Sequence, residues 1–342
     1  MPQYAPPLTL TPTMLDLVAA ISEQVGRLSA VHETQMTPQL RRGNRIRTIQ
    51  ASLAIENNTL SVEQVTAVLD GKRVLGLPRE IQEVRNAFAT YEAMPHWRPE
   101  SRADLLKAHD LLMHGLIDDA GHLRQGGVGI YREDRLLHMA PPANRVAELI
   151  DQLLAWLAKT DLHPLIASCV FHYEFEFIHP FADGNGRMGR LWQTLILSRW
   201  RPVLAYLPVE TVIREKQDAY YAALSAADHA AVATPFVEFM LGSIKQALVQ
   251  TEATDQATDQ VTDQVTDQVK RLLNVLKNHP PLKAGELMER LGLTHRPTFR
   301  GNYLSPALAN NLIEMTDPSS PKSPAQKYRL TARGNAAIKK SA

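Results

Sequence analysis

Residues 162–200, LHPLIASCVFHYEFEFIHPFADGNGRMGRLWQTLILSRW, constrain the fold more than any other part of the chain. Two stretches, 162–177 and 187–200, repeat apolar residues at intervals of three and four, which predicts α-helices with a buried face. Between them Asp183-Gly184-Asn185-Gly186 is a dense turn signal. The sequence therefore predicts two buried helices joined by a short glycine-rich turn.

The same three- and four-residue spacing recurs upstream of residue 250 and predicts a mainly α-helical body. Ser61 and Ser101 lie three residues before Gln64 and Asp104, where N-cap residues are expected. The further expected helices cover residues 15–31, 44–55, 61–69, 80–94, 102–116, 143–157 and 214–226.

Residues 121–142, GHLRQGGVGIYREDRLLHMAPP, interrupt the helical pattern. Two short β-prone pieces, 128–131 and 136–139, flank a polar turn and end at Pro141-Pro142, which predicts a β-hairpin. A lone hairpin is weakly stable by itself. We therefore expect it to contact a partner.

Composition sets the class of protein. The chain has 342 residues, of which 44% are hydrophobic and 21% are charged, so a sizeable folded core is expected. The single cysteine, Cys169, excludes a disulfide framework and a thiolate zinc site within the chain. The first residues lack a signal-peptide pattern, and no apolar run is long enough to span a bilayer, so we expect a cytoplasmic protein with no membrane partner.

Charge divides the chain into two parts. Residues 270–342 carry 13 Lys and Arg against 4 Asp and Glu, a net charge of +9, which leaves −8 on residues 1–269. Between these parts, residues 251–269 contain a repeated [A/V]-T-D-Q. Its period of four overshoots the helical 3.6, so an apolar face would drift around a helix. A linker is the first interpretation, with a solvated helix or a short oligomerisation helix, and so a homodimer, left open.

The C-terminal part predicts a winged-helix domain. Residues 270–279, 284–291 and 296–310 are expected to form helices, followed by two β-prone pieces around a Ser/Pro-rich loop. Three helices and a two-stranded wing are typical of that fold. Phosphate contacts are expected from Arg296, Arg300, Lys322, Lys327 and Arg329, although docking to a protein is an equal alternative to DNA binding.

The turn at 179–190, HPFADGNGRMGR, combines groups that suit chemistry on a nucleotide. A glycine-rich turn at a helix N-terminus favours phosphate, because its backbone amides lack partners. Arg187 and Arg190 are three residues apart and are expected to reach one anion. Asp183 offers a hard oxygen ligand for Mg²⁺, and His179 is a general base suited to neutral pH.

These twelve residues resemble the signature of the Fic family, HPFx[D/E]GNGRxxR, at every fixed position. The resemblance implies a Fic-type helical bundle that transfers AMP from ATP to a Tyr, Ser or Thr hydroxyl of a target protein. His179 would be the base, and Asp183 would hold Mg²⁺. The amides of Gly184, Asn185 and Gly186, the Asn185 side chain, Arg187 and Arg190 would bind the phosphates.

The resemblance also gives roles to two other segments. The hairpin would be a flap that pairs with the target's main chain through Val128, Gly129, Ile130, Leu137 and Met139. Residues 52–58, SLAIENN, resemble the inhibitory motif [S/T]xxxE[G/N] through Ser52, Glu56 and Asn57. Glu56 would then pair with Arg190 in the place of the γ-phosphate.

The expected organisation is an N-terminal helical region at 1–95 with the inhibitory helix, a Fic core at 96–250, a linker at 251–269 and a winged-helix domain at 270–342. The expected activity is that of a protein adenylyltransferase. Two alternatives stay open: removal of AMP from targets by the same site, and a DNA-binding regulator with a nucleotide-sensing core. The sequence identifies neither the target protein nor the oligomeric state.

Overall fold

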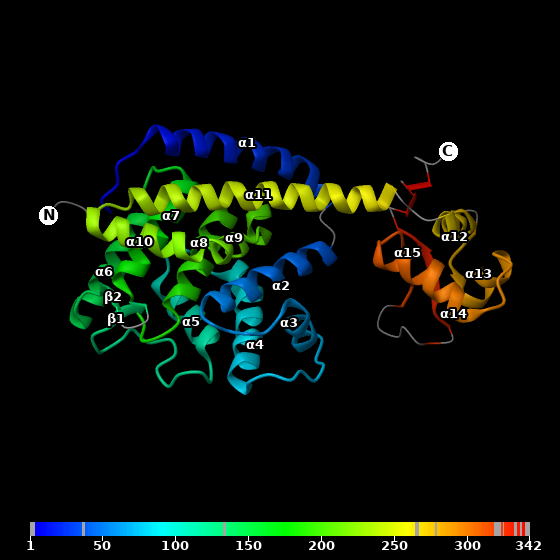
Figure 1. Cartoon of the computed structure of the whole chain (residues 1–342), viewed down its shortest axis with the longest axis horizontal. Coiled ribbons are helices and arrows are strands. Elements are labelled where there is room, and N and C mark those ends of the chain that lie inside the picture. The colour runs from blue at the N-terminus through cyan, green and yellow to red at the C-terminus, as the bar shows by residue number, and fades with distance from the viewer. Residues whose placement is uncertain are drawn as a thin grey trace. The chain divides into compact units, whose positions relative to one another are not determined.

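The computed structural model describes residues 4–338 except 36–37, 133–134, 264–266, 278, 318–322, 324, 332–333 and 336, and it leaves out the side chains of 29–40, 129–138 and 252–266. The chain divides into two compact units, Met1–Thr251 and Glu252–Ala342 (Figure 1). Each unit has its own cluster of buried hydrophobic residues. The sequence-based division of the chain into an acidic and a basic part falls close to this boundary.

The N-terminal unit is helical apart from one hairpin. Its elements are α1 (Pro12–Gln35), α2 (Pro38–Ile55), α3 (Val62–Leu69), α4 (Pro78–Ala93), η1 (Met94–His96), α5 (Arg102–Met113), β1 (Gly129–Arg132), β2 (Arg135–Met139), α6 (Ala143–Leu157), α7 (Pro164–Ile178), α8 (Asn185–Trp200), η2 (Pro202–Tyr206), α9 (Val209–Glu215), α10 (Gln217–Ala230) and α11 (Thr234–Asp263).

The helices α7 and α8 lie at the centre of this unit, with α1 and α11 above them and α4 and α5 below in Figure 1. Nearly every residue of α7 and most residues of α8 are buried. The largest of these side chains is Trp192, which is fully buried and donates from its indole Nε1 to the Pro99 carbonyl at 2.8 Å. Burial of both helices on several faces explains why their sequences are almost continuously apolar.

Local signals fix several helix starts as predicted. Ser61 and Gln64 form a reciprocal capping box at α3, and the Ser101 hydroxyl accepts from the Asp104 amide at α5. The expected helix at 214–226 is wrong in extent, because the helical hydrogen bonding breaks at Lys216 and divides the region into α9 and α10. The sequence did not predict the part of α11 that precedes residue 251.

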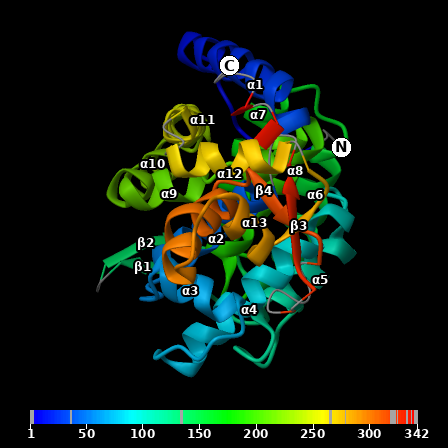
Figure 2. The same ribbon diagram turned by 90° about the vertical axis from the view of Figure 1, so that its right-hand side faces the viewer.

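The predicted hairpin is present and projects from the edge of the N-terminal unit in Figure 2. Its strands are antiparallel, with Gly129 opposite Met139 and Arg132 opposite Arg135. The register shifts between Ile130 and Tyr131, so Leu137 has no Cα partner across the ladder. The polar turn at 133–134 lies outside the described residues.

The boundaries expected at 95/96 and at 251–269 look different in the structure. One hydrophobic cluster includes residues from Met14 to Leu248, so the segments 1–95 and 96–250 share one core. The [A/V]-T-D-Q repeat is helical as far as Asp263, because α11 continues to that residue. This part of the repeat is therefore helical, and both the solvated helix and the oligomerisation helix stay open as interpretations.

The C-terminal unit contains α12 (Asp267–Lys277), β3 (Leu282–Lys283), α13 (Ala284–Arg290), α14 (Arg296–Phe299), η3 (Arg300–Leu304), α15 (Ser305–Ala309), β4 (Ile313–Met315) and β5 (Lys327–Leu330). The three strands form one antiparallel sheet in the order β3-β5-β4. The expected helices and the hairpin β4–β5 are present, and β3 was not predicted. The expected third helix, 296–310, is divided into α14, the π-helical segment η3 and α15.

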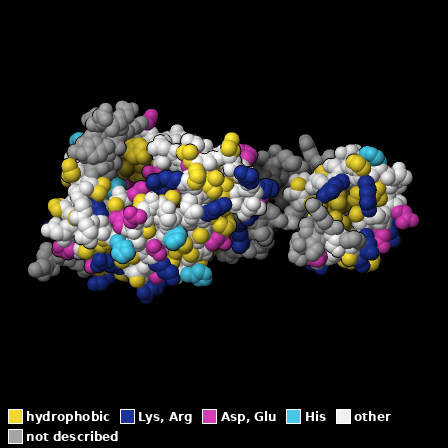
Figure 3. Space-filling model, turned by 90° about the horizontal axis from the view of Figure 1, so that it is seen from below, with side chains coloured by type: hydrophobic (Ala, Val, Ile, Leu, Met, Phe, Trp, Pro, Cys, Tyr) yellow, Lys and Arg dark blue, Asp and Glu magenta, His cyan; other side chains and the backbone are white. Residues whose placement is uncertain are grey.

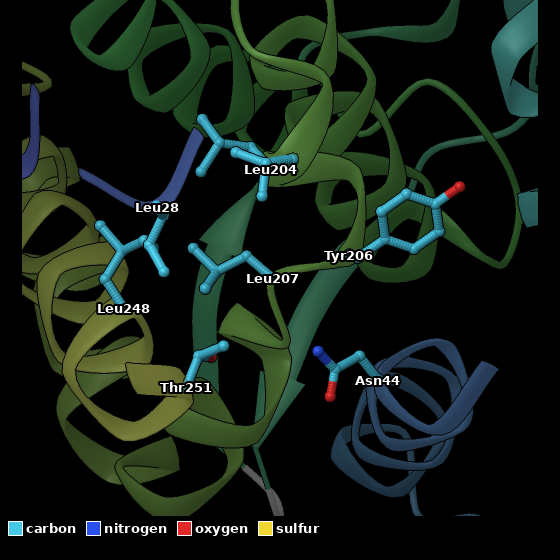
Figure 4. Close-up of a pocket in the computed structure, with 8 residues that line it drawn as sticks. Leu28, Asn44, Leu204, Tyr206, Leu207, Leu248 and Thr251 are labelled. Atoms are coloured by element: carbon cyan, nitrogen blue, oxygen red, sulfur yellow. The ribbon is translucent and has the colours of Figure 1, made fainter. Parts of the chain in front are cut away.

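A small pocket opens among α1, α2, η2 and α11 (Figure 4). Leucines form half of its lining: Leu28, Leu204, Leu207 and Leu248. The amide nitrogen of Asn44 there is buried and has no hydrogen-bond partner among the described residues. Among the described residues that line the pocket, none is charged, so the pocket lacks the cationic groups that favour a phosphate. Within the described residues, no helix has the length and apolar character needed to cross a bilayer.

Candidate active site

The C-terminal end of α7 presents His179 in a strained backbone conformation. Its φ of 49° and ψ of 63° lie in the left-handed region, which is uncommon for a residue with a side chain. The His179 amide donates to the Phe175 carbonyl at 2.9 Å, which closes the helix. His179 Nδ1 lies 3.3 Å from the Glu176 carbonyl. Because a carbonyl only accepts, this contact favours the tautomer with hydrogen on Nδ1 and the lone pair on Nε2.

The loop after His179 is held by its own side chains. Asn185 accepts from the Phe181 amide through Oδ1 and donates to the Phe181 carbonyl through Nδ2, both at 2.9 Å. The side-chain amide of Asn185 is thus engaged with the loop backbone. It was expected to contact a phosphate. Gly184, which precedes Asn185, has a φ of 83°. A Cβ atom built on Gly184 would lie 2.7 Å from Met113 Sδ. Glycine is therefore required at this turn.

A histidine that the sequence analysis did not single out supports the same loop from α5. His109 is fully buried, and its ring stacks on that of Phe181 at a centroid distance of 3.6 Å. Its Nδ1 accepts from the Gly121 amide at 2.9 Å, so Nε2 carries the hydrogen that is donated to the Asp183 carbonyl at 3.0 Å. Burial lowers the pKa of His109 to about 4, which keeps the ring neutral.

Asp183 and Arg187 form a small charged network with α4. Arg187 Nη2 lies 3.1 Å from Asp183 Oδ1, and Arg79 Nη2 lies 3.3 Å from Asp183 Oδ2. Glu83 also accepts from Arg187, at 3.4 Å. The Arg187 side chain is buried, whereas that of Asp183 is 42% exposed. Arg79 and Glu83 were not predicted, since single charged residues on an amphipathic helix carry no distinguishing pattern.

Arg190 contacts the segment that resembles the inhibitory motif. Its Nε donates to Ser52 Oγ at 3.1 Å, and its Nη2 donates to the Ser52 carbonyl at 3.0 Å and to Glu56 Oε1 at 2.8 Å. Burial, the largest single influence, would lower the pKa of Arg190, but the Glu56 carboxylate together with Tyr220 and Glu176 raises the pKa above its ordinary value. The structure therefore brings Ser52, Glu56 and Arg190 together across more than 130 residues of chain.

The Glu56 carboxylate also lies at the first turn of α8. A Cβ built on Gly186 would be 2.4 Å from Glu56 Oε1 and 3.1 Å from Arg190 Nη1. An anion is favoured there, because α8 begins at Asn185 with unpaired amides and the positive end of its dipole. Arg187 and Arg190, expected on one anion, are instead engaged by different carboxylates.

Asn57 ends α2 in a way that directs Glu56. Its φ of 68° is left-handed, and the Asn58 amide returns to the Leu53 carbonyl at 3.1 Å. This is the hydrogen bond of a helix C-terminus closed by a left-handed residue, a position that favours Gly or Asn. Asn57 thus closes the turn that follows the last helical residue, Ile55, and Glu56 lies in this turn.

The site has few side chains that could hold a metal ion. Within the described part of the chain, no three His, Cys, Asp or Glu side chains are grouped as metal ligands. Asp183 offers a partly exposed carboxylate on the loop, already paired with two guanidinium groups. One carboxylate beside a phosphate site fits Mg²⁺, which keeps waters and takes the rest of its ligands from a nucleotide.

Family models match two parts of the chain. Residues 99–197 match the Fic/DOC family, and residues 267–331 match the Filamentation induced by cAMP protein Fic-like, C-terminal domain. The first match includes the glycine-rich loop, His109 and the hairpin. The second falls within the basic C-terminal unit.

Curated relatives match more than half of the chain. The protein adenylyltransferase Fic of Drosophila virilis is 26% identical over 242 residues, 67% of this chain, and that of Nematostella vectensis is 28% identical over 202 residues, 56% of this chain. This chain spans about half the length of these proteins, 47% and 45%.

Solved structures extend the likeness to the whole chain. A crystal structure of a Fic family protein from Desulfovibrio desulfuricans G20 is 62% identical, covers 96% of this chain and 99% of its own, and superimposes with a TM-score of 0.74. Fic-1 of C. elegans, 23% identical over 72% of each chain, shares the fold with a TM-score of 0.57. The mainly α-helical architecture expected from the sequence is thereby confirmed, and the chain belongs to the Fic family.

Proposed function

We propose that this protein transfers AMP from ATP to a hydroxyl group of a target protein, and that Glu56 restrains this activity. The observation that carries the proposal is the contact of Glu56 with Arg190 and with the first turn of α8. A carboxylate there occupies an anion site that otherwise suits a phosphate. The names of the curated relatives support the same activity.

In the proposed reaction, the target hydroxyl oxygen attacks the α-phosphorus of ATP. The bond between the α-phosphorus and the bridging oxygen breaks, and pyrophosphate leaves. His179 Nε2 accepts the hydroxyl proton, since Nδ1 is directed to the Glu176 carbonyl. His179 lies at the end of α7 in a left-handed conformation, directly before the loop that would hold the phosphates.

The nucleotide would be held by α8 and its preceding turn. The amides of Gly184, Asn185 and Gly186 and the side chains of Arg187 and Arg190 are the proposed phosphate ligands. Asn185 contributes in a second way, because its side chain fixes the shape of the loop. Asp183 would hold Mg²⁺, which when bound neutralises charge on the phosphates. Asp183 must first release Arg79 and Arg187, which then become available to phosphate oxygens.

The target would be presented by the hairpin. In the described residues its sheet has two strands, so an extended peptide can pair with an outer edge. Val128, Gly129, Ile130, Leu137 and Met139 are the proposed docking residues, and the Met139 side chain is 62% exposed. The irregularity at Leu137, opposite Ile130 and Tyr131, breaks the regular ladder within this surface.

Labelling of the protein itself tests the proposal. Wild-type, Glu56→Gly and Glu56→Gly/His179→Ala proteins are incubated with Mg²⁺ and ATP labelled at the α-phosphate. We expect strong labelling of Glu56→Gly, weak labelling of the wild type, and none of a Glu56→Gly/His179→Ala double variant. Equal labelling of wild type and Glu56→Gly would contradict the restraining role of Glu56. No labelling of any variant would contradict AMP transfer.

For the C-terminal unit we propose binding to DNA. Arg296 and Arg300 are exposed, lie four residues apart at α14 and η3, and belong to a segment with a net charge of +9. Figure 3 shows Lys and Arg side chains beside exposed hydrophobic groups on one face of this unit. Arg329 is paired with Glu314 at 2.6 Å, and Lys322 lies outside the described residues.

Fluorescence anisotropy with a labelled duplex tests this second proposal. Binding should weaken as salt rises, and an Arg296→Ala/Arg300→Ala variant should have a shallower salt dependence, because fewer counterions are released. Arg27→Ala is a control, since Arg27 is an exposed side chain of α1 in the other unit. Binding that is absent, or unaffected by the double substitution, would favour docking to a protein.

A further inference from the structure

Arg124 joins the hairpin to the end of α7 through a set of hydrogen bonds that the proposed chemistry does not use. It precedes the hairpin and is 3% exposed. Its Nε donates to the His179 carbonyl at 2.7 Å, and its Nη2 donates to the Ile178 carbonyl at 3.2 Å. Its own amide donates to the Pro180 carbonyl at 3.0 Å. Three successive residues of the loop therefore depend on Arg124.

The same guanidinium reaches both ends of the hairpin. Nη1 donates to the Gly126 carbonyl at 2.8 Å, before β1, and Nη2 donates to the Pro141 carbonyl at 2.5 Å, after β2. The Ala140 amide also donates to the Val128 carbonyl at 3.2 Å and closes the base of the hairpin. Each of these side-chain hydrogen bonds ends on a main-chain carbonyl, so Arg124 fixes backbone positions.

The C-terminal end of α7 favours a cation such as the Arg124 guanidinium. The last carbonyls of a helix lack amide partners, and the negative end of the dipole favours a positive charge. His179 must in addition hold a left-handed conformation that a non-glycine residue adopts at a cost. A planar guanidinium with five N–H donors can meet several carbonyls at once, which a lysine ammonium cannot do with the same geometry.

We propose that Arg124 is a positioning residue that fixes the distance between the hairpin and His179. The inference rests on the proposed function, in which the hairpin presents the target and His179 removes its proton. Because one side chain holds both parts, a hydroxyl docked on the hairpin meets the base in a fixed geometry. Arg124 contacts neither the phosphate ligands' side chains nor Glu56, so its loss should affect transfer more than nucleotide binding.

The test compares Arg124→Lys with Arg27→Lys, both in the Glu56→Gly protein. Arg27 is exposed on α1 and pairs only with Glu23 among the described ion pairs, so it is a matched control for the substitution itself. Two quantities are measured: labelling by ATP marked at the α-phosphate, and the Kd for ATP by calorimetry. We expect Arg124→Lys to lower the labelling rate by about tenfold to a hundredfold, as small misplacements of reacting groups do, and to leave the Kd unchanged.

Hydrogen exchange followed by mass spectrometry gives a readout that does not depend on activity. In Arg124→Lys, amide protection should fall in residues 126–141 and 178–181 and stay unchanged in α2 and α11. Labelling and exchange equal to those of Arg27→Lys would overturn the proposal. A Kd that weakens in parallel with labelling would also overturn it, because Arg124 would then act on the nucleotide site.

Two further arms keep the result interpretable. Arg124→Ala leaves a cavity for a free guanidinium ion, and restored labelling on addition of guanidinium hydrochloride is expected if the position of the cation matters. If Arg124→Ala fails to fold, Arg124→Lys alone decides. If the Glu56→Gly parent is not labelled, the proposed function fails, whereas the exchange pattern still tests the positioning role of Arg124.

Discussion

At the residue scale, His172, buried behind the glycine-rich loop, is neutral. His172 is fully buried on α7, with Nδ1 2.7 Å from Gln193 Oε1 and Nε2 3.2 Å from the Tyr220 hydroxyl. An amide oxygen only accepts, so Nδ1 donates and Nε2 accepts from tyrosine. Burial lowers the pKa of His172 from 6.5 to about 3.

This depressed pKa predicts a loss of stability in acid. Between pH 6.5 and 3 the unfolded chain binds a proton that folded His172 does not, so the free energy of unfolding falls as pH falls through that window. Each unit of pKa difference is worth about 1.4 kcal/mol. Urea unfolding of wild type and His172→Asn, at steps from pH 7 to 4, should show a shallower pH dependence for the variant.

The comparison between variants isolates His172 from other buried groups. Burial raises the pKa of Glu210 to about 7. The stability that this shift contributes is fully present below pH 4.5 and is lost as pH rises through 7. The contribution of Glu210 to the free energy of unfolding therefore changes with pH in the opposite direction to the contribution of His172. His229→Asn serves as a control, because His229 is exposed on α10. A pH dependence of His172→Asn that matches the wild type would show that His172 is not the group responsible.

At the element scale, the end of α2 controls where Glu56 lies. The left-handed Asn57 ends the helix, and the exposed side chain of Asn57 is not needed for packing. We expect Asn57→Val to destabilise this turn by about 1 kcal/mol or more, because a β-branched residue disfavours positive φ. Glu56 should then hold Arg190 less firmly, and labelling of the otherwise wild-type protein should rise.

Asn57→Gly is the matched control, because glycine adopts the same conformation without strain. It should keep the low labelling of the wild type. Thermal unfolding of both variants separates a local change from global destabilisation. Labelling of Asn57→Val as low as that of Asn57→Gly would mean that the restraint does not depend on this turn.

Elements were predictable where the signal is local. The helices α7 and α8 follow from their apolar residues, and the hairpin follows from its β-prone pieces between glycine and proline signals. The strand β3 was missed because Leu282 and Lys283 are extended through pairing with β5, more than forty residues later. The division between α9 and α10 at Lys216 has no Gly or Pro to mark it.

The loop residues of the candidate site were predictable from the sequence, and the residues that hold the loop in place were not. The loop residues are consecutive in the sequence, and the segment 52–58, which resembles the inhibitory motif, indicated Glu56. His109 had a signal in the sequence, since it lies four residues after Leu105 on the buried face of α5. Arg124 had none, because its partners are main-chain carbonyls of residues 126, 141, 178 and 179, and a carbonyl leaves no trace in the sequence.

At the scale of the whole molecule, two separate cores predict two separable activities. The hydrophobic cluster of the N-terminal unit ends at Leu248, and that of the C-terminal unit begins at Val269. The proposed nucleotide ligands and Glu56 all belong to the first unit. A chain of residues 1–263, which retains all of α11, should therefore fold and keep the labelling of the full-length protein, both in the wild type and in Glu56→Gly.

Calorimetry and labelling of the shortened chain check this expectation together. The full-length protein should show two unfolding transitions, and residues 1–263 should retain one of them at the same Tm, because each core is buried within its own unit. DNA binding should be lost with residues 264–342. If the shortened wild type were labelled as strongly as Glu56→Gly, the restraint would need the C-terminal unit as well, and the contact of Glu56 with Arg190 would be only one part of it.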